Sequence, residues 1–427
     1  TPSSYALTNP LMFVNLQWIL WKNGIHLWPQ GVQDVCEVMQ LSLTKIFTRL
    51  ISKRKVKFFD KGGYMIWGII SDTHGDKGNA IPHIVAEFKK RNVELIIHCG
   101  DIETQHLNPE LFGNLPVYCA LLEEQSDKIE FKNPPEKWVF TRPKNRILDI
   151  NGQRIYLGHK RSFDFLMNSE IELIKILAEI RKTNDNLRWL FSGHTHHQIY
   201  QQGIVNFINP GAIETTIDGY EFAVIDTKTG QVVFSRIHKT NPIKETFSIG
   251  VISDTLDISE MNPVFWEKLV KELNNRGVKF IVHCGNIAIN DIGRKELCNF
   301  EVFYNLREDQ IRKLLKTEKP PENWHLIERE NPVVEINGYK FYVQLDLGID
   351  LLEKSEIAMQ KLCRELRRKY PEISFVLCGF TNDAFYEEGE QVRIVNPGDA
   401  NQSQNMAVIC LPRAEITFSN VPFDPLP

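Results

Sequence analysis

Residues 71–76 read SDTHGD, and residues 253–258 read SDTLDI. Each stretch follows a run of strand-forming residues, MIWGII (65–70) in the first case and FSIGVI (247–252) in the second. A continuous apolar run of this kind is typical of a strand that is buried on both faces. The chain therefore places an aspartate after a buried strand twice, with a histidine two residues later only in the first case.

Four further segments recur in the same order along the chain. They are IIHCGD (96–101) with IVHCGN (281–286), PPEKW (134–138) with PPENW (320–324), LFSGHTH (190–196) with VLCGFTN (376–382), and INPGA (208–212) with VNPGD (395–399). A solenoid repeats every 20–50 residues or so, far less than the spacing between these pairs. The pattern predicts two tandem domain copies, over 65–240 and 247–423, with a polar linker around 238–246.

Strand and helix patterns alternate inside each predicted copy. Ile81, Ile84, Val85 and Phe88 follow helical spacing, and residues 169–184 form a second amphipathic pattern. The second copy repeats this order, with helices expected at 263–277 and 355–370. Later strands include a hairpin that turns at Thr229 and Gly230. The order predicts an α/β layered sandwich, present twice.

Composition narrows the class of protein. The 427 residues are 42% hydrophobic and 24% charged, which is ordinary for a globular protein. A net charge of −4 gives no global basic field to attract nucleic acid. No apolar run reaches the roughly 18–20 residues that span a bilayer. Eight cysteines without a repeated CxxC favour buried thiols in a reducing compartment, so we expect a cytoplasmic protein with no membrane association.

Residues 1–64 match neither copy, and three interpretations stay open for them. The stretch LTKIFTRLISKRKVKFF (43–59) fits a basic amphipathic helix that contacts a membrane or a partner, or binds nucleic acid. The second interpretation is a solvated, poorly ordered tail. The third is that these residues lie outside the native coding sequence, because KGGYM (61–65) can be encoded by a purine-rich ribosome-binding sequence just before Met65.

Ionisable side chains of the first copy stand at strand ends. They are Asp72, His74, Asp101, His159, His194 and His196. Strand ends on one edge of an open α/β sheet converge on one crevice, so we expect these six groups to meet there. Burying them without a cation would cost several kcal/mol each. The sequence therefore predicts two divalent metal ions at this crevice.

The donor set also limits the chemistry. Asp101 is the best candidate to bridge both ions, because a carboxylate has two oxygens. Mixed nitrogen and oxygen donors suit manganese, our first expectation, or iron, zinc, cobalt or nickel, and argue against calcium. Two such ions about 3.5–4 Å apart lower the pKa of a bridging water and neutralise phosphoryl oxygens during in-line displacement. We expect a small phosphoester as substrate and nucleic acid only as a substrate.

Taken together, SDTHGD, HCGD, SGHTH and INPGA resemble the calcineurin-like metallophosphoesterase superfamily, in particular its small prokaryotic phosphodiesterase branch. The resemblance implies an αββα layered sandwich with metals at the strand ends. It implies that Asp72, His74, Asp101 and His196 hold one metal. It also implies that Asp101, His159 and His194, with an asparagine, hold the other. That branch often lacks the general-acid histidine of calcineurin-type members, so phosphodiesters are expected over monoesters.

The chain departs from that family pattern in two places. Glu123 stands where the family has its asparagine, and it either ligates through its longer arm or points elsewhere and leaves the position to water. Lys160 and Arg161 follow His159 where members often have another histidine. Either residue could bind a substrate phosphate, and the alternative is that both are ordinary surface charges.

The second copy has lost most of these ligands. Asp254 and Glu308 keep a carboxylate, whereas the other positions become Leu256, Asn286, Leu345, Phe380 and Asn382. One or two carboxylates cannot hold two metals, so we expect a metal-free copy whose apolar side chains fill the pocket. It would serve as the partner of an internal pseudo-dimer in a monomeric chain, as a cap, or as a regulatory domain. The alternative to an enzyme is a ligand-binding or scaffold protein with a residual metal site.

Overall fold

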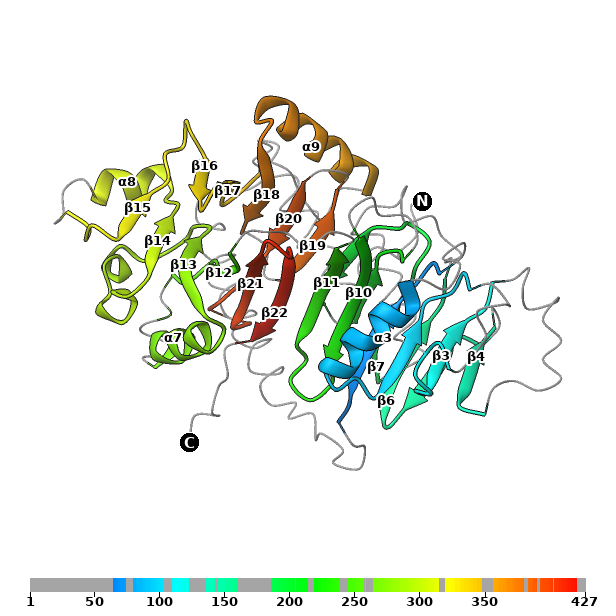
Figure 1. Cartoon of the computed structure of the whole chain (residues 1–427). Helices are drawn as coiled ribbons and strands as arrows, with labels where there is room; N and C mark the ends of the chain where they lie inside the picture. Colours follow the sequence, from blue (N-terminus) through cyan, green and yellow to red (C-terminus); the bar gives the residue numbers. More distant parts are fainter. Residues whose placement is uncertain are drawn as a thin grey trace, which may run out of the picture. The chain divides into compact units, whose positions relative to one another are not determined.

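The computed structural model describes most of the chain after residue 63 (Figure 1). The described residues are 64–73, 80–102, 110–122, 136–142, 145–159, 186–203, 205–213, 219–238, 245–256, 258, 264–314, 319–347, 356–379, 383–389, 392–401 and 403–420.

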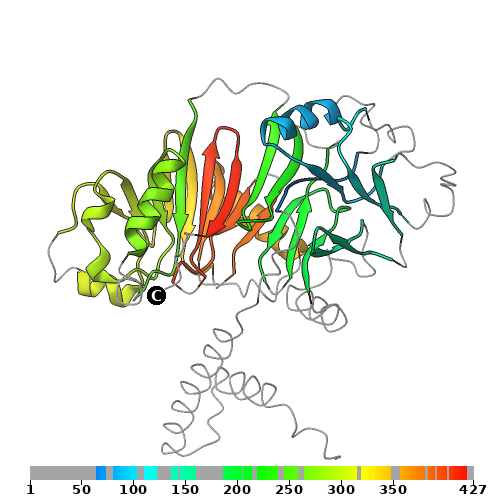
Figure 2. The ribbon, with the colours of Figure 1, turned by 90° about the horizontal axis from the view of Figure 1, so that it is seen from below.

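Strands from both halves of the chain join into a first sheet. Its described strands, twelve in all, run in the order β15 (Trp324–Leu326), β14 (Glu301–Tyr304), β13 (Val278–His283), β12 (Phe247–Ile252), β21 (Asn405–Leu411), β22 (Glu415–Asn420), β11 (Val232–His238), β10 (Gly219–Asp226), β1 (Ile66–Ile70), β2 (Leu95–His98), β3 (Val117–Ala120) and β4 (Trp138–Thr141). Figure 2 shows β21 and β22, in red, beside the green strands β10 and β11.

A second sheet is built in the same way. Its ten described strands follow the order β16 (Val333–Ile336), β17 (Tyr339–Gln344), β18 (Ile373–Cys378), β20 (Arg393–Asn396), β19 (Phe385–Glu388), β8 (Gln198–Gln201), β9 (Asn206–Pro210), β7 (Leu187–Phe191), β6 (Gln153–Leu157) and β5 (Ile147–Ile150). Buried apolar residues from both sheets form a shared cluster that includes Trp67, Phe191 and Phe341. This sandwich confirms the predicted α/β layered fold.

The two halves meet strand to strand at the middle of both sheets. In the first sheet Phe234 of β11 pairs with Ile416 of β22. In the second sheet Tyr200 of β8 pairs with Tyr386 of β19. Read outward from these pairs, the strands occur in matching order on both sides. The halves are therefore fused through backbone hydrogen bonds rather than packed as separate domains.

Helices cover the outer faces, and their sequence patterns predicted several of them. They are α3 (Ala80–Lys90), α7 (Phe265–Asn275), α8 (Glu308–Leu314) and α9 (Glu356–Lys369), with short 3-10 turns at Ile289–Asp291 and Lys295–Leu297. The expected helices at 263–277 and 355–370 and the hairpin turn at Thr229 and Gly230 are confirmed. The helix predicted over 169–184 and most of the expected linker lie outside the described residues.

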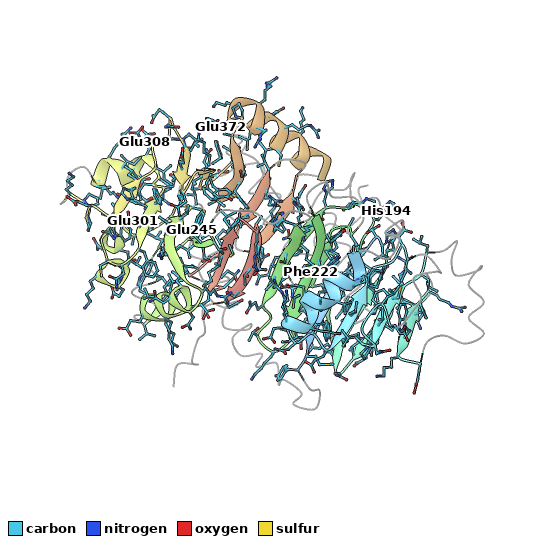
Figure 3. The ribbon with its side chains drawn as sticks, in the orientation of Figure 1. His194, Phe222, Glu245, Glu301, Glu308 and Glu372 are labelled. Atoms are coloured by element: carbon cyan, nitrogen blue, oxygen red, sulfur yellow. The ribbon has the colours of Figure 1, made fainter. Side chains whose placement is uncertain are left out.

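Helix α3 shows how close packing fixes the layer. Its buried side chains include Ile81, Ile84 and Phe88, which face the strands. Phe88 meets Phe222 of β10 edge to face, with ring centroids 5.4 Å apart. Phe222 is labelled in Figure 3. A Cβ on Gly68 of β1 would lie 2.5 Å from the Phe88 ring, so only glycine lets the helix approach this closely.

Four cysteines of the apolar runs, Cys99, Cys119, Cys284 and Cys378, are buried as expected. Among the described residues, no helix is both long enough and apolar enough to cross a membrane.

Candidate metal centre

Two strands from each sheet deliver the candidate ligands to one end of the N-terminal half. β1 and β2 are parallel neighbours in the first sheet, and Asp72 and Asp101 follow their ends. β6 and β7 are parallel neighbours in the second sheet, and His159 and His194 follow their ends. The strand ends therefore converge as predicted. The first sheet supplies two carboxylates, and the second sheet supplies two imidazoles.

The backbone turns sharply at each of these residues. Asp72, Asp101, His194 and His196 have φ values of 52°, 55°, 78° and 62°. Side chains other than glycine rarely adopt this left-handed region, and such conformations cluster at functional sites. Backbone hydrogen bonds hold the turns, from Asp72 N–H to the Gly100 carbonyl and from Thr73 N–H to the Asp101 carbonyl, both 3.1 Å.

Gly100 is required for the closest approach between the sheets. Its φ is 104°, and a Cβ added here would overlap the Cβ of His159. The glycine of HCGD therefore lets His159 of the second sheet lie against the first sheet beside Asp101.

Carboxylate and imidazole atoms converge within a few ångströms. Nε2 of His159 lies 3.7 Å from Oδ1 of Asp72 and 4.0 Å from Oδ2 of Asp101. Potential ligand atoms of these three residues all lie within 4.8 Å of one another. The rings of His159 and His194 meet at a centroid distance of 5.4 Å. Nε2 of His196 lies 3.2 Å from Oδ1 of Asp72. His194 is exposed and is labelled in Figure 3.

A contact with a backbone carbonyl fixes the tautomer of His159. Its Nδ1 lies 3.1 Å from the Cys99 carbonyl, which can only accept, so Nδ1 carries the proton. Nε2 then presents a lone pair toward Asp72 and Asp101. Burial lowers the pKa of His159, and the two carboxylates oppose this effect without reversing it. The ring is therefore neutral, as a metal ligand must be.

Asp72 has an oxygen that the protein does not satisfy. Oδ2 accepts the His194 N–H at 3.1 Å, but the buried Oδ1 receives no well-aligned hydrogen bond from the described residues. Burial alone would raise the pKa of Asp72, but the imidazoles of His196 and His159 outweigh burial and lower the pKa. An ionised oxygen that faces two imidazole nitrogens fits a divalent cation between them.

Asn209 is a positioning residue that the sequence did not reveal. It is buried, and its Nδ2 donates to the Gly193 carbonyl at 3.1 Å and to Thr195 Oγ1 at 2.9 Å. Its Oδ1 accepts from Gly211 N–H at 3.1 Å. Asn209 thus shapes the turn that carries His194 and His196. The recurring NPG tripeptide was the available signal, because Asn396 makes matching bonds with Gly379 and Gly398 in the other half.

His98 has a structural role in this structure. Thr73 Oγ1 lies 3.0 Å from its Nε2, and Gly100 N–H donates to its Nδ1 at 3.1 Å. His283 makes the same two contacts with Thr255 and Gly285. Both ring nitrogens are engaged, so His98 has no free lone pair for a metal.

The structure brings together five of the predicted site residues, namely Asp72, Asp101, His159, His194 and His196. The remaining predicted positions, His74, Glu123, Lys160 and Arg161, lie outside the described residues.

The matching region of the C-terminal half is closed by hydrogen bonds. Asp254 and Asn286 keep positive φ values of 56° and 58°. Asp254 accepts from Ser253 Oγ at 2.7 Å and from Asn286 Nδ2 at 3.0 Å. Arg307 donates to Asn286 Oδ1 at 3.1 Å. Leu345 lies against Gly285 as His159 lies against Gly100.

This network adds to what the sequence predicted. Apolar side chains at Leu256 and Phe380 were expected to fill the pocket. Leu256 is half-buried, and Phe380 lies outside the described residues. The Ser253 hydroxyl and the Asn286 amide donate to the Asp254 carboxylate, and Arg307 donates to that amide, an arrangement that the sequence did not predict.

Comparisons with known proteins agree with this geometry. The model of the calcineurin-like phosphoesterase superfamily domain matches residues 65–230. A probable metallophosphoesterase of Methanothermobacter thermautotrophicus is 27% identical over 152 residues, which cover 35% of this chain and 77% of that protein. A second one, from Methanocaldococcus jannaschii, is 29% identical over 158 residues, covering 36% and 71%.

Among solved structures, an archaeal phosphodiesterase aligns with a TM-score of 0.29 and 19% identity over 40% of this chain and 98% of its own. The family match spans all five clustered residues. Residues 65–230 of this chain therefore belong to the calcineurin-like phosphoesterase superfamily.

Proposed function

We propose that the N-terminal half, residues 65–240, hydrolyses phosphate esters, preferentially phosphodiesters, at a centre that holds two divalent metal ions. The observation that carries the proposal is the unsatisfied, buried Oδ1 of Asp72, which faces the nitrogens of His196 and His159 at 3.2 and 3.7 Å. A buried ionised oxygen without a well-aligned hydrogen bond is costly unless a cation completes it.

The side chains divide the work between two positions. Asp72 and His196, with His74, would hold one ion, and His159 and His194, with Glu123, would hold the other. Asp101 lies within reach of both groups and would bridge them. When bound, the ions supply Lewis acidity, which lowers the pKa of a water and stabilises charge on the phosphoryl oxygens.

The protein contributes orientation and electrostatics. The Cys99 carbonyl holds His159 in the tautomer with a free Nε2. Asn209 holds the turn that aims His194 and His196. Lys160 and Arg161 follow the ligand His159 in the chain, and we propose that they bind the phosphate oxygens of the substrate. We keep manganese as the first candidate metal, since the donors are nitrogen and oxygen.

We further propose that the C-terminal half arose by duplication and has no catalytic metal. Asp254 accepts hydrogen bonds from Ser253 and Asn286, and Arg307 donates to Asn286 and brings a positive charge near this position. This half completes both sheets, so its role is that of a built-in partner subunit within one chain.

Hydrolysis of bis(4-nitrophenyl) phosphate and of 4-nitrophenyl phosphate with added Mn²⁺ tests the proposal. We expect the diester to be hydrolysed faster, and Asp101→Asn and His196→Ala to lose at least about 100-fold in kcat. Asp254→Asn is the matched control in the other half and should retain activity.

The alternative, a scaffold with a residual metal site, makes a different prediction. Activity absent from the wild-type protein, or unchanged in Asp101→Asn and His196→Ala, would favour the scaffold. Activity lost equally in Asp254→Asn would contradict the division of labour between the halves.

A further inference from the structure

Two side chains of the C-terminal half reach across the junction and hydrogen-bond to groups of the N-terminal half. Glu388 of β19 accepts from Arg236 of β11, with the Nη2 of the arginine 2.5 Å from Oε1 of the glutamate. The hydroxyl of Tyr386, also in β19, donates to Oε1 of Gln198 in β8 at 3.2 Å. Glu388, Tyr386 and Gln198 are buried, and the side chain of Arg236 is only 9% exposed.

The contact of Glu388 continues to a turn beside the metal centre. Arg236 pairs with Glu221 of β10 and donates to its carboxyl group. Glu221 in turn accepts the Ala212 N–H at 3.3 Å. A Cβ added to Gly211 would overlap the same carboxyl oxygen. The turn at residues 211 and 212 therefore lies directly against Glu221.

Gln198 holds the same turn through a second set of contacts. Its Nε2 lies 3.2–3.3 Å from the carbonyls of Pro210, Phe222 and Ser235, which can only accept. Gln198 thus ties β8 to the turn and to both β10 and β11. The hydroxyl of Tyr386 binds the remaining oxygen of this amide and so fixes its orientation.

The segment 209–213 contacts the ligand-bearing loops at both of its ends. Asn209, at one end, holds the turn that carries two of the candidate ligand imidazoles. Ile213, at the other end, donates its N–H to the carbonyl of Ser71 at 3.3 Å, and Ser71 directly precedes the candidate ligand Asp72. A displacement of this segment would therefore move imidazole and carboxylate ligands together.

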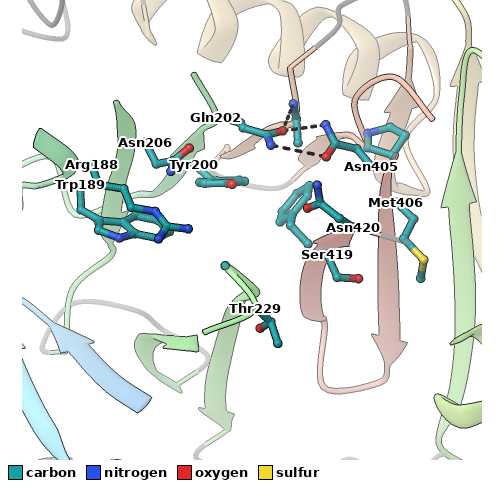
Figure 4. Close-up of a pocket in the computed structure, with 14 residues that line it drawn as sticks. Arg188, Trp189, Tyr200, Gln202, Asn206, Thr229, Asn405, Met406, Ser419 and Asn420 are labelled. Atoms are coloured by element: carbon teal, nitrogen blue, oxygen red, sulfur yellow. Dashed lines mark hydrogen bonds between the residues drawn. The ribbon is translucent and has the colours of Figure 1, made fainter. Parts of the chain in front are cut away.

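A corresponding contact in the opposite direction is made by neutral amides. Tyr200 and Tyr386 are direct strand partners, so Gln202, two residues after Tyr200, corresponds to Glu388. Gln202 reaches into the C-terminal half and binds the side-chain amide of Asn405, with hydrogen bonds of 2.7 and 3.4 Å. Figure 4 shows this amide pair joined by dashed lines.

Asn405 corresponds in turn to Glu221. Each of these two side chains lies against the glycine of an NPG tripeptide, where an added Cβ would overlap it. The strand partner of Glu221 is Arg236, whereas the strand partner of Asn405 is Asn420. The crossing contact is therefore charged beside the candidate metal centre and neutral in the half that has lost the ligands.

The tyrosine contact differs between the two directions as well. Ala384 stands two residues before Tyr386, as Gln198 stands two residues before Tyr200. The Tyr386 hydroxyl binds Gln198, whereas Tyr200 and Ala384 line a cavity of about 260 Å³ (Figure 4). Both contacts toward the N-terminal half thus use side chains that their counterparts do not match.

Charge at the crossing is not required by the fold, since the amide pair closes the corresponding position without it. Glu388 is the ionised partner of Arg236, because burial and the charge of Glu388 raise the pKa of Glu221. Burial of ions incurs a desolvation cost that a neutral pair avoids. Once formed, such a pair resists displacement, because moving either partner leaves a buried charge uncompensated. The charged crossing therefore holds its surroundings in one arrangement.

We propose that Glu388 and Tyr386 are positioning residues for the metal centre of the other half. Through the contacts described above they fix the segment 209–213, and with it the candidate ligands at its two ends. This role rests on the proposed function and adds that the metal-binding half depends on the metal-free half for its affinity for manganese.

Calorimetric titration of the full-length protein with Mn²⁺, well below the melting temperature of every variant, measures this role. Glu388→Gln removes the charge with little change of shape, and we expect its manganese affinity to fall by about fivefold or more. Tyr386→Phe removes only the hydroxyl that binds Gln198, and its manganese affinity should fall by at least about threefold.

Two control variants remove the corresponding groups in the opposite direction. Asn405→Ala breaks the amide pair, and Tyr200→Phe removes the hydroxyl of the other paired tyrosine. Both should keep manganese affinity within about twofold of wild type. Asn405→Ala should nevertheless lower the melting temperature, as Glu388→Gln does, because buried hydrogen bonds are lost in both. The comparison separates positioning from a general loss of stability.

Manganese affinity within about twofold of wild type in Glu388→Gln would overturn the proposal. If thermal melts show that this variant does not fold, the same result in Tyr386→Phe would overturn it. An equal loss of affinity in Asn405→Ala would also overturn it. Wild-type protein that binds no manganese would overturn the proposed function itself, and this role with it, whereas unchanged variants of a manganese-binding protein would overturn this role alone.

Discussion

Asn209→Ala and Asn396→Ala separate the stability of a strand-end turn from its function. Asn209 makes hydrogen bonds of 3.1, 2.9 and 3.1 Å with Gly193, Thr195 and Gly211. At about 1 kcal/mol each, with buried groups left unsatisfied, the substitution should cost about 3 kcal/mol. The corresponding fall in Tm is about 6–12 °C at 2–4 °C per kcal/mol. Asn396 makes bonds of 3.2 and 2.9 Å with Gly379 and Gly398, so its loss should cost about 2 kcal/mol.

The two variants should differ in function far more than in stability. Asn209→Ala frees the turn that carries His194 and His196, so we expect manganese affinity and phosphodiesterase activity to fall by about tenfold or more. Asn396→Ala should keep both within about twofold, because no candidate ligand depends on its turn. Calorimetric melts and manganese titration at a temperature well below both melting points measure the two effects. Equal loss of metal binding in both variants, or full activity in Asn209→Ala, would show that Asn209 does not position His194 and His196.

Three further predictions follow from single contacts. Gly100→Ala should abolish activity, because the added Cβ would overlap the Cβ of His159 and the backbone φ at this position is 104°. A variant with wild-type activity and a wild-type melting temperature would contradict the close approach of the sheets. His159→Ala should reduce bound manganese from two ions per chain to one by elemental analysis, and an unchanged count would exclude it as a ligand. For Glu388, burial alone would raise the pKa, but Arg393 and Arg236 hold it at about 2. A pKa depressed from 4.5 contributes stability that is present above pH 4.5 and lost as the pH falls toward 2. Glu388→Gln should therefore cost about 3 kcal/mol or more at pH 7 and flatten this acid dependence in denaturant titrations, and an unchanged pH profile would contradict it.

Local patterns predicted the elements and the site but not how the halves join. Buried apolar runs marked β1, β2, β12 and β13, and helical spacing marked α3, because burial on one or two faces leaves a period in the sequence. The pairings of Tyr200 with Tyr386 and of Phe234 with Ile416 left no such trace. Whether edge strands meet or remain apart depends on the packing of the whole chain, which no short window encodes.

The candidate ligands were predictable because each follows a strand end, where a carboxylate or imidazole after an apolar run stands out. Asn209 and Arg307 were missed for the opposite reason. Their effect depends on which backbone carbonyl or amide each side chain reaches, at Gly193 in one case and Asn286 in the other. The ligand roles of His74 and Glu123 and the phosphate contacts of Lys160 and Arg161 stay predictions.

Anomalous diffraction from crystals grown with Mn²⁺ tests the central claim most directly. We expect two manganese peaks about 3.5–4 Å apart in the N-terminal half, bridged by Asp101 and bordered by Asp72 and His159, and no peak beside Asp254. Crystals that show no peak among these residues, or an equally strong peak beside Asp254, would contradict it.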